Sequence, residues 1–183
     1  EPAERVAHDL LGLMPPGLDH VFFSDSGSTA VEVALKMALG FRHNRGEAQS
    51  RVLVLEHSYH GDTIGAMSVG ARGVFNRAYS PLLFDVGTIP FPHAGREQET
   101  LDALEVACSA GDACAFIVEP LVLGAGGMLM YVADTLRAMH AICAHYGVLF
   151  IADEVMTGWG RTGALLACQQ AGVAPDILCL SKG

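Results

Sequence analysis

The sequence predicts an α/β domain in which a mostly parallel sheet has helices on both faces. Four segments are apolar at nearly every position, as strands are when both of their faces are buried: residues 51–55, 114–118, 148–152 and 176–180. Apolar residues at helical spacing separate them, with helices expected over 97–109 and 134–146. No repeat, low-complexity tract or linker divides the 183 residues, so we expect one domain.

The N-terminal part adds three elements. Residues 2–13 show helical periodicity, and residues 20–24 are expected to form a short strand. Another helix is expected over 28–42, where Glu32 and Lys36 have the spacing of a helical ion pair. Such alternation of strands and helices is typical of α/β folds.

The charge balance narrows the classes of partner. The chain has 11 Lys and Arg against 20 Asp and Glu, a formal net charge of -9, and no basic block. A nucleic-acid or anionic-membrane surface needs such a block. The longest apolar stretch, 116–131, is interrupted by Glu119, Pro120 and glycines, so no membrane span or signal peptide is expected. Small molecules remain as the expected partners.

Cysteine usage indicates a reducing compartment. The five cysteines are odd in number, lie at scattered positions and form no Cys-x-x-Cys pair. Disulfide frameworks are typical of small secreted domains and rare in the cytoplasm. We therefore expect a cytoplasmic protein.

Two features predict that the chain is a fragment of a longer protein. It begins with Glu1 rather than Met, and it stops at Gly183 directly after a strand-like run. Its hydrophobic fraction of 51% lies slightly above the usual range. We therefore expect some of its apolar surface to be covered by further chain or by a partner subunit.

Chemistry-bearing residues follow four of the expected strands, where the ligands of parallel sheets gather. These residues are Gly27 with Ser28, Glu119, Asp153 and Lys182. At Gly27 and Ser28 a strand turns into a helix, so free backbone N–H groups, a hydroxyl and the positive helix end would meet an anion such as phosphate. The alternative is that Ser26 or Ser28 serves only as an N-cap.

Asp153 and Lys182 are the reactive candidates. An apolar strand delivers Asp153 to the sheet edge beside a second acid, Glu154, and the alternation of side chains sends one of the two inward. The alternative for Asp153 is a helix or turn cap. An amine that follows a buried strand, as at Lys182, is suited to forming a Schiff base, whereas a solvated flanking lysine is the alternative.

As a set, these groups match the needs of pyridoxal 5'-phosphate. This cofactor requires a phosphate site, an acid for its pyridinium nitrogen and an amine for its aldehyde. The segment Tyr59–Thr63, which includes His60, follows another strand, and Tyr59 offers a flat face on which a pyridine ring could stack. The alternative for Tyr59 is an aromatic ring packed under a loop.

A metal site is a weaker hypothesis. Histidines and a cysteine stand at helical spacings in two places, at His57 and His60 and at His140, Cys143 and His145. Neither place offers the further ligands that would complete a metal site or the acids that would orient those ligands. We therefore expect no metal.

Residues 158–163 read Gly-Trp-Gly-Arg-Thr-Gly, which matches the dinucleotide-binding pattern Gly-x-Gly-x-x-Gly. That pattern should start in the turn directly after its strand and be followed by an acid at the end of the next strand. Here residues 153–157 intervene, and Asp176 opens the next strand instead of ending it. A nicotinamide cofactor is therefore disfavoured.

Seven segments in order carry a resemblance that covers nearly the whole chain. They are Asp25–Leu39, Tyr59–Val69, Glu119–Pro120, Gly124–Met128, Ile151–Val155, Gly160–Gly163 and Pro175–Lys182. Together they resemble the class III, fold-type I, pyridoxal-phosphate-dependent aminotransferases. The resemblance implies that residues 1–183 are part of the large cofactor-binding domain of such an enzyme, with an N-terminal segment and a C-terminal domain outside this chain.

The resemblance assigns cofactor contacts to particular residues. Gly27 and Ser28 would hold the phosphate. Tyr59 would stack near the ring and line the substrate pocket, and His60 would lie near the ring. A threonine from the other subunit of a homodimer would complete the phosphate site.

The catalytic residues follow in the same way. Asp153 would pair with the pyridinium nitrogen and Glu119 would support Asp153. Lys182 would form the Schiff base with the cofactor, contact the substrate and move a proton during transamination. The implied reaction converts 8-amino-7-oxononanoate to 7,8-diaminononanoate in biotin biosynthesis, with S-adenosylmethionine or lysine as amino donor.

Two alternatives stay open. Val132 and Ala133 stand where close relatives have His-Pro, and the arginine that binds the substrate carboxylate lies outside this chain. The runner-up is therefore another class III aminotransferase, of the ω-amino acid or ornithine type. A non-catalytic remnant or binding module is the second alternative, and we expect the 183-residue chain alone to be inactive.

Overall fold

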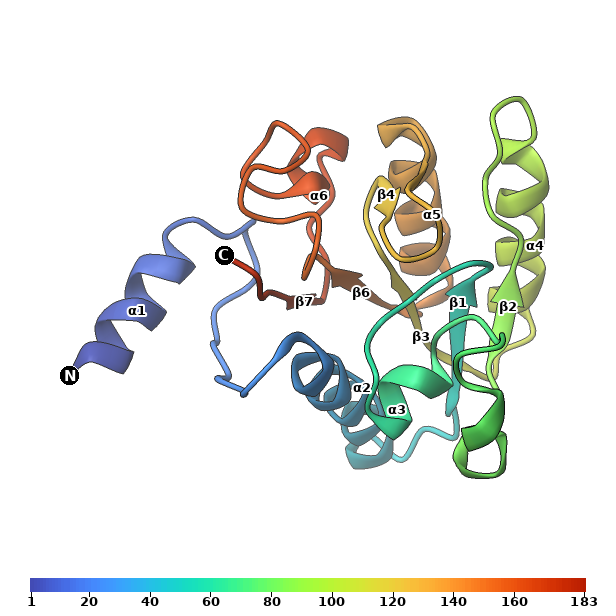
Figure 1. The fold of residues 1–183 in the computed structure, drawn as a ribbon, viewed down its shortest axis with the longest axis horizontal. Coiled ribbons are helices and arrows are strands. Elements are labelled where there is room, and N and C mark those ends of the chain that lie inside the picture. Colours follow the sequence, from blue (N-terminus) through green and yellow to red (C-terminus); the bar gives the residue numbers. More distant parts are fainter.

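The computed structural model describes residues 1–183, whose centre is a five-stranded sheet with the order β2-β1-β3-β6-β7 (Figure 1). Every neighbouring pair of strands is parallel. The strands are β1 (Arg51–Leu55), β2 (Gly87–Ile89), β3 (Ala113–Val118), β6 (Leu149–Asp153) and β7 (Ile177–Cys179). The predicted fold class is confirmed.

Helices cover both faces of this sheet, as Figure 1 shows. One face carries α2 (Gly27–Asn44) and the short α3 (Ile64–Ser68). The other carries α4 (Glu97–Ser109), α5 (Ala133–Tyr146) and α6 (Ala167–Ala171). The N-terminal α1 (Pro2–Leu11) lies apart from both layers and has no buried residue.

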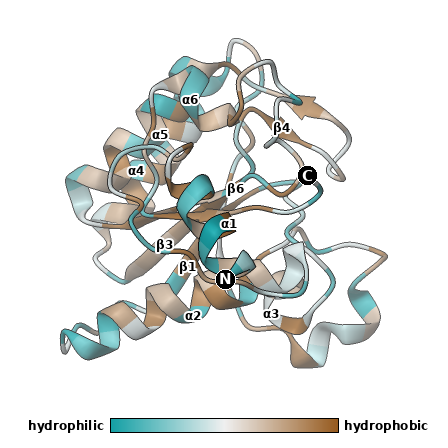
Figure 2. Ribbon diagram, turned by 90° about the vertical axis from the view of Figure 1, so that its left-hand side faces the viewer, coloured by the Kyte–Doolittle hydropathy of each residue, from teal (hydrophilic) through white to brown (hydrophobic).

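The alternation of strand side chains divides the core into two clusters. The cluster under α4, α5 and α6 includes Leu53, Leu55, Phe116 and Phe150. The cluster under α2 and α3 includes Val52, Val54, Ile117 and Ile151. Because both faces are covered, the strands have no polar side, and Figure 2 shows them in brown between the helical layers.

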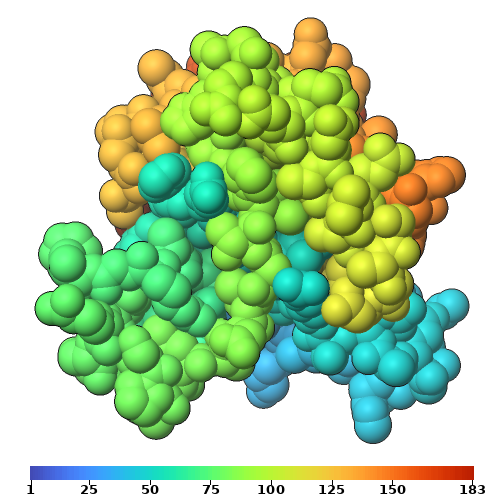
Figure 3. All heavy atoms as spheres, turned by 90° about the vertical axis from the view of Figure 1, so that its right-hand side faces the viewer, coloured from blue at the N-terminus to red at the C-terminus, as the bar shows by residue number.

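Two further features lie outside the sheet. The two-stranded antiparallel hairpin of β4 (Val122–Leu123) and β5 (Leu129–Met130) follows β3. The segment 72–84 contains the 3₁₀-helix η1 (Arg77–Leu82) and forms the green protrusion in Figure 3. Its side chains Val74, Phe75 and Leu82 are exposed.

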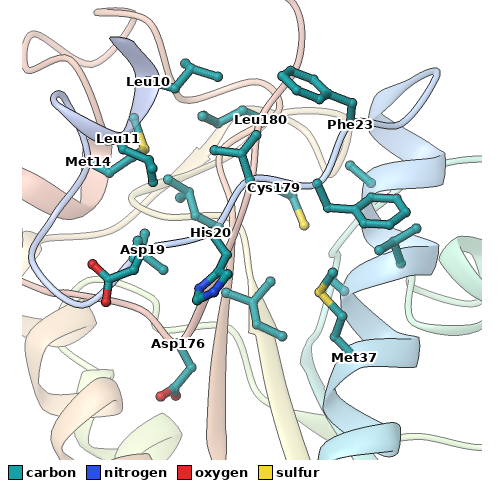
Figure 4. Close-up of a pocket in the computed structure, with 18 of the residues that line it drawn as sticks. Leu10, Leu11, Met14, Asp19, His20, Phe23, Met37, Asp176, Cys179 and Leu180 are labelled. Carbon is teal, nitrogen blue, oxygen red and sulfur yellow. The ribbon is translucent and has the colours of Figure 1, made fainter. Parts of the chain in front are cut away.

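The strand predicted at 20–24 is wrong. These residues have no regular secondary structure, and β7 pairs only with β6. A cavity of about 600 Å³, lined mainly by hydrophobic side chains, lies between residues 17–24, α2 and β7 (Figure 4). Both the segment and β7 line this cavity, and no ladder hydrogen bonds join their two main chains.

The predicted ion pair between Glu32 and Lys36 does not form either. The Glu32 carboxylate instead accepts hydrogen bonds from the backbone N–H groups of Gly65, at 2.7 Å, and Ala66, at 3.3 Å. These are groups at the start of α3, which have no partner within that helix. Glu32 therefore caps α3 and connects it to α2.

Candidate functional site

The ends of β3, β6 and β7, which the sequence singles out, lie at one edge of the sheet. Gly27 reaches this edge from α2, because the strand expected before it is absent. A Cβ on Gly27 would lie 2.6 Å from Cγ1 of Val155 and 3.5 Å from Cβ of Ser181. Val155 stands two residues after Asp153, and Ser181 directly precedes Lys182. The first turn of α2 therefore approaches the ends of both β6 and β7, and only a glycine fits there.

Ser26, not Ser28, is the N-cap of α2. The Ser26 hydroxyl accepts from the Thr29 N–H at 3.2 Å, and the Thr29 hydroxyl accepts from the Ser26 N–H at 2.8 Å. The Ser28 hydroxyl accepts from the Asp62 N–H at 3.2 Å. Since the first N–H groups of a helix have no intrahelical partner, those of Gly27 and Ser28 are suited to an anion.

The loop that contains Tyr59 and His60 lies against this helix start. Gly61, with φ 131°, contacts Ser28 so closely that a Cβ at position 61 would overlap the Ser28 side chain. Glycine is therefore required at position 61 by both its backbone conformation and the close packing. The loop and the first turn of α2 form one continuous surface.

His60 and Asp153 form a buried pair. Nδ1 of His60 lies 2.7 Å from Oδ2 of Asp153, and both residues are buried. An ionised carboxylate only accepts hydrogen bonds, so with an ionised Asp153 the hydrogen of this bond is the one on Nδ1 of His60. The other carboxylate oxygen accepts from the Val155 N–H at 3.1 Å, and Nε2 of His60 has no partner. Two donors thus orient the Asp153 carboxylate and leave it further lone pairs.

The neighbouring acid, Glu154, is turned to the other side of the strand. Its carboxylate accepts from the Thr157 hydroxyl at 2.7 Å and from the N–H groups of Ala167, at 2.9 Å, and Cys168, at 2.7 Å. Glu154 is fully buried and stabilises the start of α6. Of the two acids, only Asp153 faces the loop that contains His60.

We expect Glu154→Gln to lower the free energy of unfolding by about 3 kcal/mol, because the amide NH₂ would face at least one of three buried donors. Urea titration at fixed protein concentration measures this change. The control Glu105→Gln alters an exposed side chain on α4 and should stay within about 0.5 kcal/mol of the unmodified protein. Equally small changes in both variants would contradict a structural role for Glu154.

Glu119 supports the loop and not Asp153 directly. The Glu119 carboxylate accepts from the N–H groups of Tyr59, at 3.0 Å, and Gly124, at 2.9 Å, and makes no hydrogen bond to Asp153. Burial raises the pKa of Glu119, whereas the nearby His60 and the two backbone donors oppose this shift. Any support from Glu119 therefore reaches Asp153 through the Tyr59–His60 segment.

Tyr59 presents an accessible ring at the same edge. Its side chain is 40% exposed, and its hydroxyl donates to Oδ2 of Asp62 at 2.9 Å. Burial and, after it, the hydrogen bond to Asp62 raise the pKa of Tyr59, so the phenol stays neutral at physiological pH. The ring is thus held at one end and is open to a flat ligand.

Lys182 follows β7 with an exposed side chain. Its backbone is in the left-handed region, with φ 51°, which is uncommon for a residue other than glycine. Two residues that sequence reasoning missed, Trp159 and Arg161, hydrogen-bond to the main chain around it. Their signal is the glycine-rich segment 158–163, which also matches a nucleotide-binding pattern and contributes Gly160–Gly163 to the family resemblance.

The histidines and cysteines that the sequence offers as metal ligands do not form a cluster with acids. No three His, Cys, Asp or Glu side chains lie together in a way that could hold a metal ion. The His57 ring packs against Phe91 and the His140 ring against Phe150. All five cysteines are buried and free. No helix has both the length and the apolarity needed to cross a membrane.

Comparisons with known proteins point to one family. The Aminotransferase class-III family model matches residues 1–183. Adenosylmethionine-8-amino-7-oxononanoate aminotransferase of Synechococcus elongatus is 53% identical over 191 residues, which cover 100% of this chain and 45% of that protein. The chain thus spans less than half the length of this relative.

Solved structures agree with this assignment. The adenosylmethionine-8-amino-7-oxononanoate aminotransferase of Methanocaldococcus jannaschii is 34% identical with a TM-score of 0.91, covering 100% of this chain and 43% of that one. An amine transaminase of an uncultivated Pseudomonas species, in its PLP-bound form, is 36% identical with a TM-score of 0.87, covering 99% and 43%. Both structures contain the fold of this chain as part of a longer protein.

Proposed function

Since this chain belongs to the class III aminotransferase family, we propose that the complete protein is a pyridoxal-phosphate-dependent transaminase of biotin biosynthesis. It would transfer an amino group to 8-amino-7-oxononanoate and form 7,8-diaminononanoate. The observation that carries this proposal is the buried Asp153–His60 pair beside the start of α2, at the sheet edge where Lys182 follows β7.

The residues at this edge fit the cofactor. The close approach at Gly27 and Gly61 leaves room for no Cβ, and the free N–H groups of an 18-residue helix favour a phosphate. The Asp153 carboxylate has lone pairs available for the N–H of a pyridinium ring. The accessible ring of Tyr59 and the exposed side chain of Lys182 supply a stacking face and an amine.

When bound, pyridoxal phosphate supplies an aldehyde that combines with amines and a ring that accepts electrons from a carbon losing its proton. In the proposed site, Asp153 holds a proton on the ring nitrogen, and His60 orients Asp153. Nζ of Lys182 takes the proton that the α-carbon of the amino donor loses. Gly27 and Ser28 bind the phosphate, and Glu119 supports the segment that carries Tyr59 and His60.

The complete protein is proposed to be a cytoplasmic homodimer in which residues 1–183 are part of the large cofactor-binding domain. The free cysteines support a reducing compartment. The apolar side chains of Val74, Phe75 and Leu82, which are 73%, 94% and 64% exposed, support a partner subunit on the protrusion of Figure 3. No nucleic acid or membrane is included among the proposed partners.

The choice of substrate is supported mainly by sequence similarity, because a relative that is 53% identical is named for 8-amino-7-oxononanoate. S-adenosylmethionine is the proposed donor, with lysine as the other possibility for this class of reaction. A second candidate is transamination of an ω-amino acid or ornithine-type substrate. The structural similarity to an amine transaminase supports it.

We expect the complete protein to convert 8-amino-7-oxononanoate with S-adenosylmethionine or with lysine, and the 183-residue chain alone to show no turnover. The reason is that the proposed site is completed by a second subunit and by segments outside this chain. Product formation, measured for both proteins with excess cofactor, tests this.

Two outcomes would contradict parts of the proposal. Amino transfer from an ω-amino acid or ornithine, without conversion of 8-amino-7-oxononanoate, would favour the second candidate. Turnover by residues 1–183 close to that of the complete protein would show that the site is not shared between subunits.

A further inference from the structure

The loop between β6 and α6 holds the main chain on both sides of Lys182. The indole Nε1–H of Trp159 donates to the carbonyl of Ser181 at 3.0 Å, and Nη2 of Arg161 donates to the carbonyl of Lys182 at 2.9 Å. Trp159 is half-buried and Arg161 is exposed. The two hydrogen bonds therefore restrain the two successive peptide groups that flank the Cα of Lys182.

Both sides of this contact have an uncommon backbone conformation. The φ angle is 51° at Lys182 and 60° at Trp159, in the left-handed region that bulky side chains rarely adopt. Such conformations persist where the surrounding structure over-determines them, and they concentrate at functional sites. Here one of them, Trp159, donates a hydrogen bond to Ser181, the residue directly before the other, Lys182.

Close packing reinforces the contact. A Cβ at Gly183 would lie 2.8 Å from Nε1 and 2.9 Å from Cε2 of Trp159, so the main chain after Lys182 lies directly against the indole. A Cβ at Gly158 would lie 2.8 Å from the Glu154 carbonyl oxygen and 3.3 Å from Cδ2 of Leu180. Glycines at both positions thus let the loop approach the end of β7.

The loop is anchored to the rest of the domain. The Gly160 N–H donates to the Leu165 carbonyl at 3.1 Å, and Nε2 of Gln170 donates to the Thr162 hydroxyl at 2.8 Å. The buried carboxylate of Glu154 accepts hydrogen bonds from Thr157, near the start of the loop, and from Ala167, the first residue of α6. A support that is fixed in this way can set the position of the groups bound to it.

We propose that Trp159 and Arg161 are positioning residues for Lys182. The peptide groups on either side of a Cα set the direction of its Cα–Cβ bond, so holding both carbonyls aims the long lysine side chain from its first bond. Precise aim matters because a small misplacement of a reacting group costs a large part of the rate. The inference rests on the proposed function, in which the Lys182 amine reacts.

Three variants of the complete protein test the inference. Trp159→Phe keeps an aromatic ring and removes the N–H donor, Arg161→Ala removes the second donor, and Arg161→Lys restores one. Arg137→Ala is the matched control, since Nε of Arg137 donates to the Ala171 carbonyl at 2.8 Å on the α5–α6 side of the molecule.

The expected result is a loss in kcat. Trp159→Phe should lower kcat by about tenfold to a hundredfold, with the KM of the amino donor changed by less than about threefold. Arg161→Ala should have a smaller effect because its hydrogen bond is exposed, and Arg161→Lys should recover part of it. Arg137→Ala should leave kcat unchanged.

A second readout does not depend on turnover. The absorbance of the cofactor linked to Lys182, titrated with pH in the absence of substrate, should have a shifted midpoint in Trp159→Phe and Arg161→Ala and an unshifted one in Arg137→Ala. The melting temperature of the cofactor-free protein should change no more in these variants than in the control.

Two results would overturn the inference. One is a kcat and a pH midpoint in both variants equal to those of Arg137→Ala. The other is a lower melting temperature with an unshifted midpoint, which indicates a structural role only. In either case the proposed function stands if Lys182→Ala is inactive, whereas full activity of Lys182→Ala would refute the proposed function itself.

Discussion

Lys182→Ala is expected to lower the rate of transamination by about a thousandfold or more, because positioned acid–base groups alone contribute about 10²–10⁴-fold and the covalent link to the cofactor is lost as well. The absorbance of the linked cofactor should disappear at the same time. The Lys182 side chain is exposed, so the substitution should leave the fold intact. Rapid mixing with the amino donor, followed by absorbance, measures the half-reaction.

The chain offers a matched control, since Lys36 is its one other lysine. Lys36 is exposed on α2 and faces no group of the candidate site. Lys36→Ala should keep both the absorbance and the rate. Borohydride reduction followed by peptide mapping should place the cofactor on Lys182 alone. Wild-type absorbance or rate in Lys182→Ala would refute the assignment.

Asp153→Asn is expected to keep the cofactor bound but to lower the rate by at least about a hundredfold, equivalent to about 2.7 kcal/mol of barrier. A neutral amide cannot hold a proton on the ring nitrogen, so the ring becomes a weaker acceptor of electrons. The amide oxygen can still accept from His60 or from the Val155 N–H, which preserves the local fold. Single-turnover kinetics at saturating cofactor measure the loss.

The control for this variant is Asp134→Asn, at an exposed position in the first turn of α5, which should retain the full rate. A loss below about tenfold in Asp153→Asn would mean that another acid serves the ring, since general acid–base groups contribute more than this. Glu154 was the obvious suspect from the sequence. Its carboxylate is occupied by three donors on the other side of β6, so it cannot replace Asp153.

Long elements could be predicted from the sequence because each carries its own signal. Strand β1 is predicted at its observed bounds and helix α4 likewise, since an unbroken apolar run and a helical period are properties of the segment alone. The parallel arrangement follows from alternating helices and fully apolar strands. The same reasoning placed Asp153 and Lys182 at one edge of the sheet. It failed for Gly27, because the strand expected at 20–24 is absent and the packing of α2 brings Gly27 to this edge instead.

Short elements could not be predicted because distant residues stabilise them. The three residues of β2 become a strand by pairing with β1, and nothing within β2 distinguishes it from a loop. Helices α3 and α6 have five residues each, too few to be stable alone, and are capped by Glu32 and Glu154 from other elements. Residues 20–24 show the opposite case. Their sequence is strand-like, but no neighbouring strand pairs with them, so they form no regular secondary structure.

The sequence alone singles out the residues that we propose to carry the chemistry: an acid and an amine after apolar strands and a glycine-serine helix start, in an order typical of one enzyme family. The tertiary structure decided how they are held. His60 and Asp153 are 93 residues apart, and Arg161 and Lys182 are 21 apart, yet each pair shares a hydrogen bond. Side-chain types and periodicity are local, whereas partners of buried polar groups depend on which loops the sheet brings together, and this arises only when the chain folds.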